Sequence, residues 1–161
     1  MQLTRYSDYS LRVLIYLAMT PERLATIEEI ATAYAISHAH LMKVVRHLGA
    51  LGLVETIRGR RGGLRLTRSP EAVNVGQVIR DTEENLALVE CFRDDGACAI
   101  ESACGLQRAL AEALEAFLAV LDGYTLADLI VRRRGELARR LGVQDGWRAP
   151  RRARQQQRGA L

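Results

Sequence analysis

The chain has three cysteines, and all of them lie in one short segment as Cys91, Cys98 and Cys104. Six residues separate the first two and five separate the last two, a spacing that matches neither the Cys-x-x-Cys pair of zinc sites nor that of thiol oxidoreductases. Thiolate sulfur is the usual ligand of iron-sulfur clusters, and the small residues between these cysteines suit a chain that folds around such a centre. The segment therefore favours an iron-sulfur cluster over a single zinc ion. The alternative is three thiols that act only as small apolar side chains.

The odd number of cysteines argues against a disulfide framework. The amino terminus, MQLTRYSDYS, lacks the layout of a signal peptide, and no apolar run approaches the roughly 20 residues of a membrane span. We therefore expect a cytoplasmic protein without a membrane partner, whose thiols are buried, reactive or bound to metal.

The composition favours a mainly α fold. Of the 161 residues 48% are hydrophobic but only 5% are aromatic, which is typical of a helical core of Leu, Ala, Ile and Val. The length suits one compact unit, or a small head with an arm. The net charge of +4 is modest, so it indicates a binding partner only if the basic residues cluster on one surface.

Apolar periodicity predicts three helices before Gly52. The first covers residues 8–20, and the second begins at a capping box formed by Thr26 and Glu29. The third begins after Ser37, a good N-cap, and turns Leu41, Val44 or Val45, Leu48 and Leu51 inward. Two short helices joined by a tight turn indicate a helix-turn-helix.

A small β-hairpin follows these helices. Residues 53–57 and 64–66 alternate as strands, and the glycine-rich and arginine-rich turn GRRGG at 59–63 joins them. Residues 1–70 are thus predicted to form a winged helix-turn-helix with the hairpin as its wing.

The second half of the chain is predicted to hold a cluster-binding loop and dimerisation helices over residues 71–141. A helix is expected at 75–82, and a long C-terminal helix after Cys104. Its apolar stripe suits burial against a second copy of the chain, although an intrachain core is the alternative. The stripe consists of Leu106, Leu110, Leu114, Phe117 and Leu121. Residues 142–161 are rich in Arg, Gln, Gly and Pro and are predicted to be a disordered basic tail.

Basic side chains lie on both the third helix and the wing, which favours DNA as the partner. A solvated helix face, or a winged helix that binds protein, is the alternative. The candidate DNA contacts are Ser37, His38, His40 and Lys43 on the helix, and Arg58, Arg60 and Arg61 on the wing.

Several separate blocks of the chain resemble one known family. They are MQLTRYSDYSLRVLIYLA at the start, RGRRGGLRL in the wing, the cysteine segment, and LDGYTLADL at residues 121–129. Over residues 1–131 the chain resembles the Rrf family of winged-helix iron-sulfur regulators, and within it the nitric-oxide-sensing repressors. This resemblance implies a homodimer that binds promoter DNA while its cluster is intact and releases the DNA when nitric oxide nitrosylates the cluster.

The same resemblance implies a ligand set. Cys91, Cys98 and Cys104 match the family's three thiolate ligands, and Asp8 matches an oxygen ligand contributed by the partner subunit. Asp8 has local alternatives, because it can cap its own helix or pair with Arg12 one turn later. A related branch that senses cluster assembly has a histidine where this chain has Gln107. A 4Fe-4S cluster is therefore preferred, and a 2Fe-2S cluster remains possible.

Two other functions are alternatives. A related winged-helix regulator would sense iron-sulfur status or oxidation through the same cluster. A thiol redox enzyme or sensor would use one cysteine as a nucleophile, but no histidine lies near the cysteines and no glycine-rich dinucleotide loop is present. We therefore expect that the protein is not an enzyme.

Overall fold

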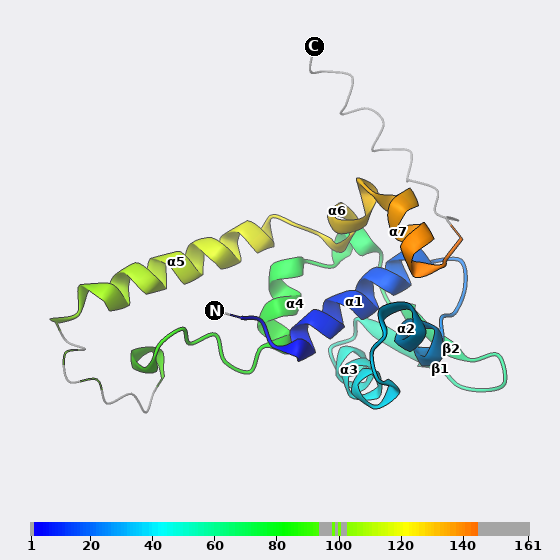
Figure 1. Cartoon of the computed structure of the whole chain (residues 1–161), viewed down its shortest axis with the longest axis horizontal. Helices are drawn as coiled ribbons and strands as arrows, with labels where there is room; N and C mark the ends of the chain where they lie inside the picture. Colours follow the sequence, from blue (N-terminus) through cyan, green and yellow to red (C-terminus); the bar gives the residue numbers. More distant parts are fainter. Residues whose placement is uncertain (1, 94–97, 99, 101–102, 145–161) are drawn as a thin grey trace, which may run out of the picture.

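The computed structural model describes residues 2–93, 98, 100 and 103–144, so the predicted tail lies outside the described residues from 145 onward. The described elements are α1 (Arg5–Met19), α2 (Ile27–Tyr34), α3 (His38–Ala50), β1 (Val54–Ile57), β2 (Gly63–Leu66), α4 (Val75–Thr82), α5 (Gly105–Asp122), α6 (Leu126–Val131) and α7 (Arg134–Leu141), with short 3-10 turns η1 (Pro70–Ala72) and η2 (Glu90–Phe92). The predicted mainly α, winged-helix fold with a long C-terminal helix is confirmed (Figure 1). No helix in the described part of the chain is long and apolar enough to cross a bilayer.

Helix α1 begins earlier than the sequence pattern predicts. Its N-cap is Thr4, whose side-chain oxygen accepts a hydrogen bond from the Ser7 amide at 3.2 Å. Asp8 therefore lies inside the helix and does not cap it. The prediction began at Asp8 because the first turn is polar, and apolar periodicity marks only the part of a helix that faces a core.

Helices α2 and α3 begin where their caps predict. The Thr26 amide donates to the Glu29 carboxylate at 2.7 Å, and the Glu29 amide donates back to the Thr26 hydroxyl at 3.2 Å. Ala35 ends α2 in the left-handed conformation with a φ of 52°, which turns the chain sharply toward Ser37, the N-cap of α3. The helix-turn-helix thus results from two strong caps separated by one tight turn.

Strands β1 and β2 pair antiparallel, with Val54 opposite Leu66 and Ile57 opposite Gly63. Two glycines make the turn of the wing possible. Gly59 has a φ of 119°, and a Cβ on Gly62 would lie 2.2 Å from the Ile57 carbonyl oxygen. Because larger residues would clash or be strained at these positions, the wing keeps a narrow tip that carries arginines.

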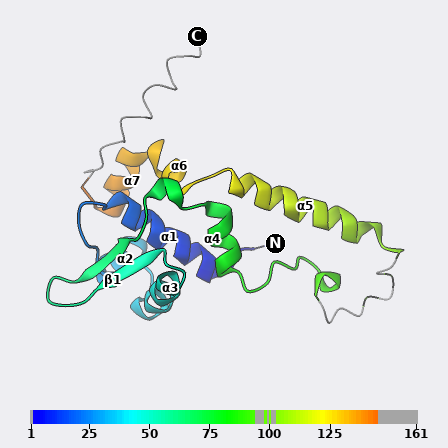
Figure 2. The ribbon, with the colours of Figure 1, turned by 180° about the vertical axis from the view of Figure 1, so that it is seen from behind.

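The core of the head surrounds α1. Leu14 and Met19 of α1 are fully buried, and α1 contacts α3, α4, α6 and α7. Figure 2 shows α6 and α7 lying on the head beside α1, although the long helix α5 separates them from it in sequence. Leu126 and Ile130 of α6 are 1% and 0% exposed, so the core draws on residues from both ends of the chain.

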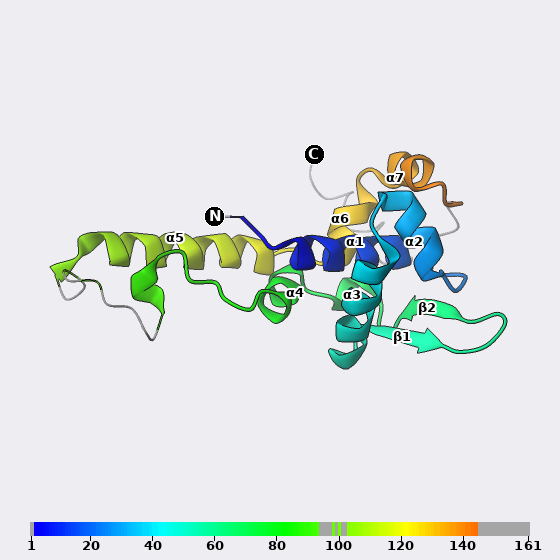
Figure 3. The same ribbon diagram turned by 60° about the horizontal axis from the view of Figure 1, so that its bottom comes forward.

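Helix α5 and residues 83–93 project from the head, and we call them the arm (Figure 3). None of the 18 residues of α5 is buried. The C-terminal end of α5 is anchored, because Arg80 of α4 forms a paired contact with the Asp122 carboxylate at 2.6 and 2.7 Å. These hydrogen bonds lower the pKa of Asp122 below its usual range. The arm is therefore held to the head mainly at its base.

We expect Ile130→Ala to lower the free energy of unfolding by about 2–5 kcal/mol, because it leaves a cavity in the core beside α1. The adjacent Val131 is 51% exposed on the same helix, so Val131→Ala should change that free energy by less than about 0.5 kcal/mol. Chemical denaturation followed by circular dichroism measures both. Equal effects of the two substitutions would contradict the packing of α6 in the head.

Candidate metal centre and nucleic-acid interface

Two of the three cysteines lie at one hollow of the arm. Cys91 is in η2 and Cys104 is the N-cap residue of α5, and both are half-buried. The hollow has a volume of about 690 Å³, and its apolar wall includes Leu86, Phe92 and Leu114. The fold thus brings together thiols that are separated by 12 intervening residues in the sequence.

Gln107 holds the two sides of this hollow together. Its side-chain Nε2 donates to the Cys91 carbonyl oxygen at 3.3 Å, which links η2 to the first turn of α5. The carboxamide therefore positions the backbone of one cysteine. The sequence raised Gln107 only as a replacement for histidine and did not predict this contact.

Cys98 is also half-buried, but it is not among the residues that line the hollow. Within the described residues, no group of three His, Cys, Asp or Glu side chains is arranged to share a metal ion. The chemistry of the two thiols nevertheless fits an iron-sulfur cluster, because they are soft sulfur donors at a half-buried, largely apolar surface.

Asp8 makes the local contact that the sequence offered as one alternative. Its carboxylate accepts from Arg12 Nε at 2.9 Å and pairs with Arg12 Nη2 at 2.8 Å. The Arg12 guanidinium also lies over the rings of Tyr9 and Tyr34, 5.9 and 5.8 Å from their centroids. Burial raises the pKa of Tyr34 to about 12. Asp8 is thus a half-exposed carboxylate paired with an arginine whose guanidinium packs on two tyrosine rings.

A buried polar contact joins the root of the arm to the start of α1. The Thr82 hydroxyl donates to Ser7 Oγ at 2.9 Å, and both residues are buried. Next to it, Glu83 accepts from the Thr4 amide at 2.8 Å and from the Thr4 hydroxyl at 3.0 Å. The last residue of α4 and the first residue of the arm are therefore fixed to the same turn of α1.

The candidate DNA-binding residues of α3 fall into two groups. His38 and Lys43 are exposed on the outer face of the helix. His40 is held near the cap, with Nδ1 2.9 Å from Ser37 Oγ and its ring 6.2 Å from the ring of Tyr9. His47, which lies two turns later, packs on Tyr6 with ring centroids 5.5 Å apart. Tyr6 and Tyr9 of α1 thus contact His47 and His40, and His40 remains exposed like His38 and Lys43.

The wing carries exposed arginines at the end of the molecule opposite the arm (Figure 3). Arg58, Arg60 and Arg61 surround the narrow turn, and all three are exposed. Arg65, further along β2, instead forms an ion pair with Glu55 across the hairpin. The wing tip and the outer face of α3 thus each carry exposed basic side chains.

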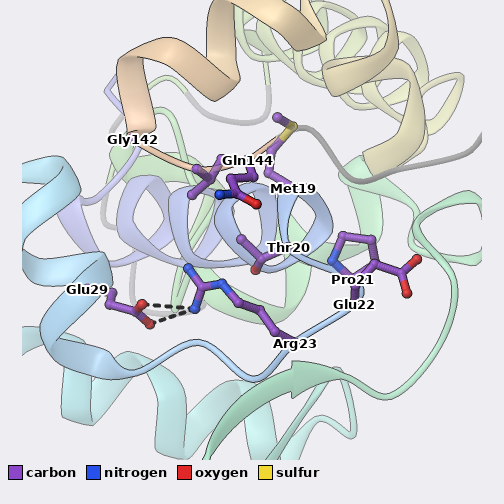
Figure 4. A pocket seen from close by; sticks show the side chains of 9 residues that line it. Met19, Thr20, Pro21, Glu22, Arg23, Glu29, Gly142 and Gln144 are labelled. Carbon is purple, nitrogen blue, oxygen red and sulfur yellow. Dashed lines mark hydrogen bonds and ion pairs between the residues drawn. The ribbon is translucent and has the colours of Figure 1, made fainter.

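A further hollow of about 570 Å³ lies between the end of α1 and the chain after α7 (Figure 4). Arg23 spans part of it and pairs with both oxygens of Glu29, at 2.9 and 3.0 Å. The Thr20 hydroxyl in its wall donates to the Tyr16 carbonyl oxygen at 3.1 Å. Arg23, Glu29 and Thr20 in this hollow therefore already have partners within the chain.

Comparison with known proteins gives consistent matches over most of the chain. Residues 3–132 match the model of the Rrf2 family, described as an iron-dependent transcriptional regulator. The HTH-type transcriptional regulator NsrR of Bacillus subtilis is 56% identical over 132 residues, which cover 81% of this chain and 90% of that protein. NsrR of Shouchella clausii is 52% identical over 133 residues, which cover 81% and 89%.

Two solved structures are similar in fold. CymR, the global cysteine regulator of B. subtilis, superposes with a TM-score of 0.67 and 30% identity over 80% of this chain and 95% of that chain. IscR of T. potens gives a TM-score of 0.63 and 25% identity over 80% and 85%. Both support the winged-helix architecture described above.

We expect Gln107→Ala to increase the rate at which a maleimide alkylates Cys91 in the metal-free protein. Loss of one hydrogen bond of about 0.5–1.5 kcal/mol should raise the population of opened states by roughly twofold to tenfold. Mass spectrometry of the labelled peptide measures the rate. Glu112→Ala, which removes an exposed side chain of the same helix that does not line the hollow, is the control and should leave the rate unchanged. An equal rate in both variants would show that Gln107 does not hold Cys91.

Proposed function

The chain belongs to the Rrf2 family of transcriptional regulators, and we propose that it is a homodimeric repressor that senses nitric oxide through an iron-sulfur cluster and then releases promoter DNA. The observation that carries this proposal is the placement of Cys91 and Cys104 at one hollow of an arm that is rooted on α1. Its relatives are named transcriptional regulators, so the chain is a regulator and not an enzyme.

We assign the cluster to Cys91, Cys98 and Cys104, with Asp8 of the partner subunit as the fourth ligand. A cluster held there would supply iron atoms that react with nitric oxide. Gln107 is engaged with the Cys91 carbonyl and has no imidazole to offer, which favours a 4Fe-4S cluster over a 2Fe-2S cluster. To act as a ligand, Asp8 would have to share or leave its contact with Arg12.

The exposed arm supports a dimer. A helix of 18 residues with no buried side chain is marginal in water, because most helical stability comes from packing of an apolar face. Leu106 and Val120, near the two ends of α5, are 63% and 62% exposed. Leu110, Leu114, Phe117 and Leu121 are half-exposed. We propose that a second copy of the chain covers this surface.

The contacts of α1 offer a physical route from the arm to the DNA-binding surface. Thr82 and Glu83 fix the root of the arm to the first turn of α1. From that same turn, the Tyr6 hydroxyl donates to the Lys43 carbonyl oxygen of α3 at 3.4 Å. A movement of the arm would therefore displace the first turn of α1 and reach α3 through contacts within one subunit, in addition to any contact through the partner's Asp8.

The central test is to purify the full chain without oxygen and titrate it with nitric oxide, while visible absorption and binding to promoter DNA are followed on the same samples. We expect a coloured protein with the mass of a dimer, and a chromophore that bleaches as DNA affinity falls by at least tenfold, or about 1.4 kcal/mol. Cys98→Ala is the matched variant and should have neither the colour nor the nitric oxide response.

The outcomes distinguish the alternatives. A colourless protein after reconstitution with iron and sulfide would contradict the cluster. A chromophore that responds to peroxide or to an iron chelator, but not to nitric oxide, would favour a regulator of iron-sulfur status or oxidation. Thiol turnover without any change in DNA binding would favour a redox function.

The wing arginines give a separate prediction about DNA. Replacement of Arg60 and Arg61 by Ala should weaken binding to all sequences and reduce the salt dependence of log K by about one for each phosphate contact that is lost. Fluorescence anisotropy at several salt concentrations measures this slope. Arg65→Ala is the control, because Arg65 already pairs with Glu55, and its slope should stay close to that of the unmodified protein. An unchanged slope in the double variant would place the wing away from the DNA backbone.

A further inference from the structure

Helix α3 carries a large apolar side chain at one edge of its basic outer face. Met42 is 53% exposed. Leu41, Val44, Val45 and Leu48 are buried and fix which side of α3 faces the core. With 3.6 residues per turn, Ala39, Met42, Lys43 and Arg46 lie on one stripe of the outer face, and all four are exposed, as are His38 and His40 near the start of the helix.

The two sides of this stripe differ. On one side, His40 and His47 lie against Tyr9 and Tyr6 of α1, and His40 is also within hydrogen-bond distance of Ser37. On the other side, Met42 extends into solvent. A DNA duplex that approaches the open side would therefore meet Met42 and Lys43 together with the exposed His38, whereas His47 lies toward α1.

The chemistry of the major groove supplies one apolar group for such a side chain, the C5-methyl of thymine. Methionine is unbranched and polarizable, so it can adjust to a methyl group whose position varies with DNA shape. Lys43 and Arg46, one and four residues further along the helix, provide the attraction to phosphates or guanine that brings Met42 into the groove.

We propose that Met42 is a specificity-determining residue of α3 that contacts a thymine methyl group in each half-site, with Ala39 beside it as the small residue that allows close approach. This inference rests on the proposed DNA-binding function. It differs from the sequence expectation by assigning Met42 a base contact and by giving His40 a role in holding the start of α3.

The experiment uses the full chain purified without oxygen. A random duplex library selects a preferred sequence, and that duplex is then synthesised with each thymine replaced singly by deoxyuridine, which lacks only the methyl group. The unmodified protein should lose about threefold to fivefold in affinity at one thymine per half-site, as expected for loss of one buried methyl contact.

Met42→Ala should bind the thymine and deoxyuridine duplexes equally, while Val131→Ala, at a similarly exposed apolar residue far from α3, should keep the full difference. His40→Ala should also keep it. If Met42→Ala still bound the thymine duplex more tightly than the deoxyuridine duplex by the same factor as the unmodified protein, the inference would be overturned while DNA binding stayed intact. Failure of the chain to select any sequence would overturn the proposed function and this inference together.

Discussion

The arrangement of the molecule depends on the burial of α1. This helix contacts the recognition helix α3, the support helix α4 and the C-terminal helices α6 and α7, and its Leu14 and Met19 are fully buried. A close-packed core transmits displacement because it has little room to absorb it. Any element attached to α1 is therefore mechanically connected to α3, although the two are joined by few direct hydrogen bonds.

The first turn of α1 is the place where this packing changes from apolar to polar. Ser7 and Thr82 are buried hydroxyls in contact across 75 residues of sequence, and each also has a local partner, Thr4 for Ser7 and the Val78 carbonyl for Thr82. Thr4 and Glu83 extend the same contact to the surface. Hydrogen bonds are directional, so this cluster fixes the angle at which the arm leaves the head more strictly than apolar contacts would.

Local signals in the sequence predicted most of the elements. The capping residues Thr26 and Ser37 and the glycines of the wing act over a few positions, and the structure follows them. The pairing of Thr82 with Ser7 and the return of α6 to α1 could not be predicted in this way, because no local pattern specifies which distant segment a hydroxyl or an apolar face will meet. The polar first turn of α1 and the contact between His40 and Ser37 could not be predicted from the sequence for a related reason. Polar residues give no periodic signal of the neighbours that they contact.

The arm differs from the head in how its position is determined. The head buries its own apolar residues, whereas α5 buries none and is held by the Arg80–Asp122 pair and the backbone contacts at its base. An element with so little packing of its own takes much of its stability from whatever binds it, whether a second copy of the chain or a metal centre. In the proposed function, the arm is a suitable place for a sensor. Loss of a ligand from a weakly packed arm changes the position of the arm without unfolding the head. The same ligand within the core around α1 would be coupled to global stability, and its loss would unfold the DNA-binding surface instead of switching it.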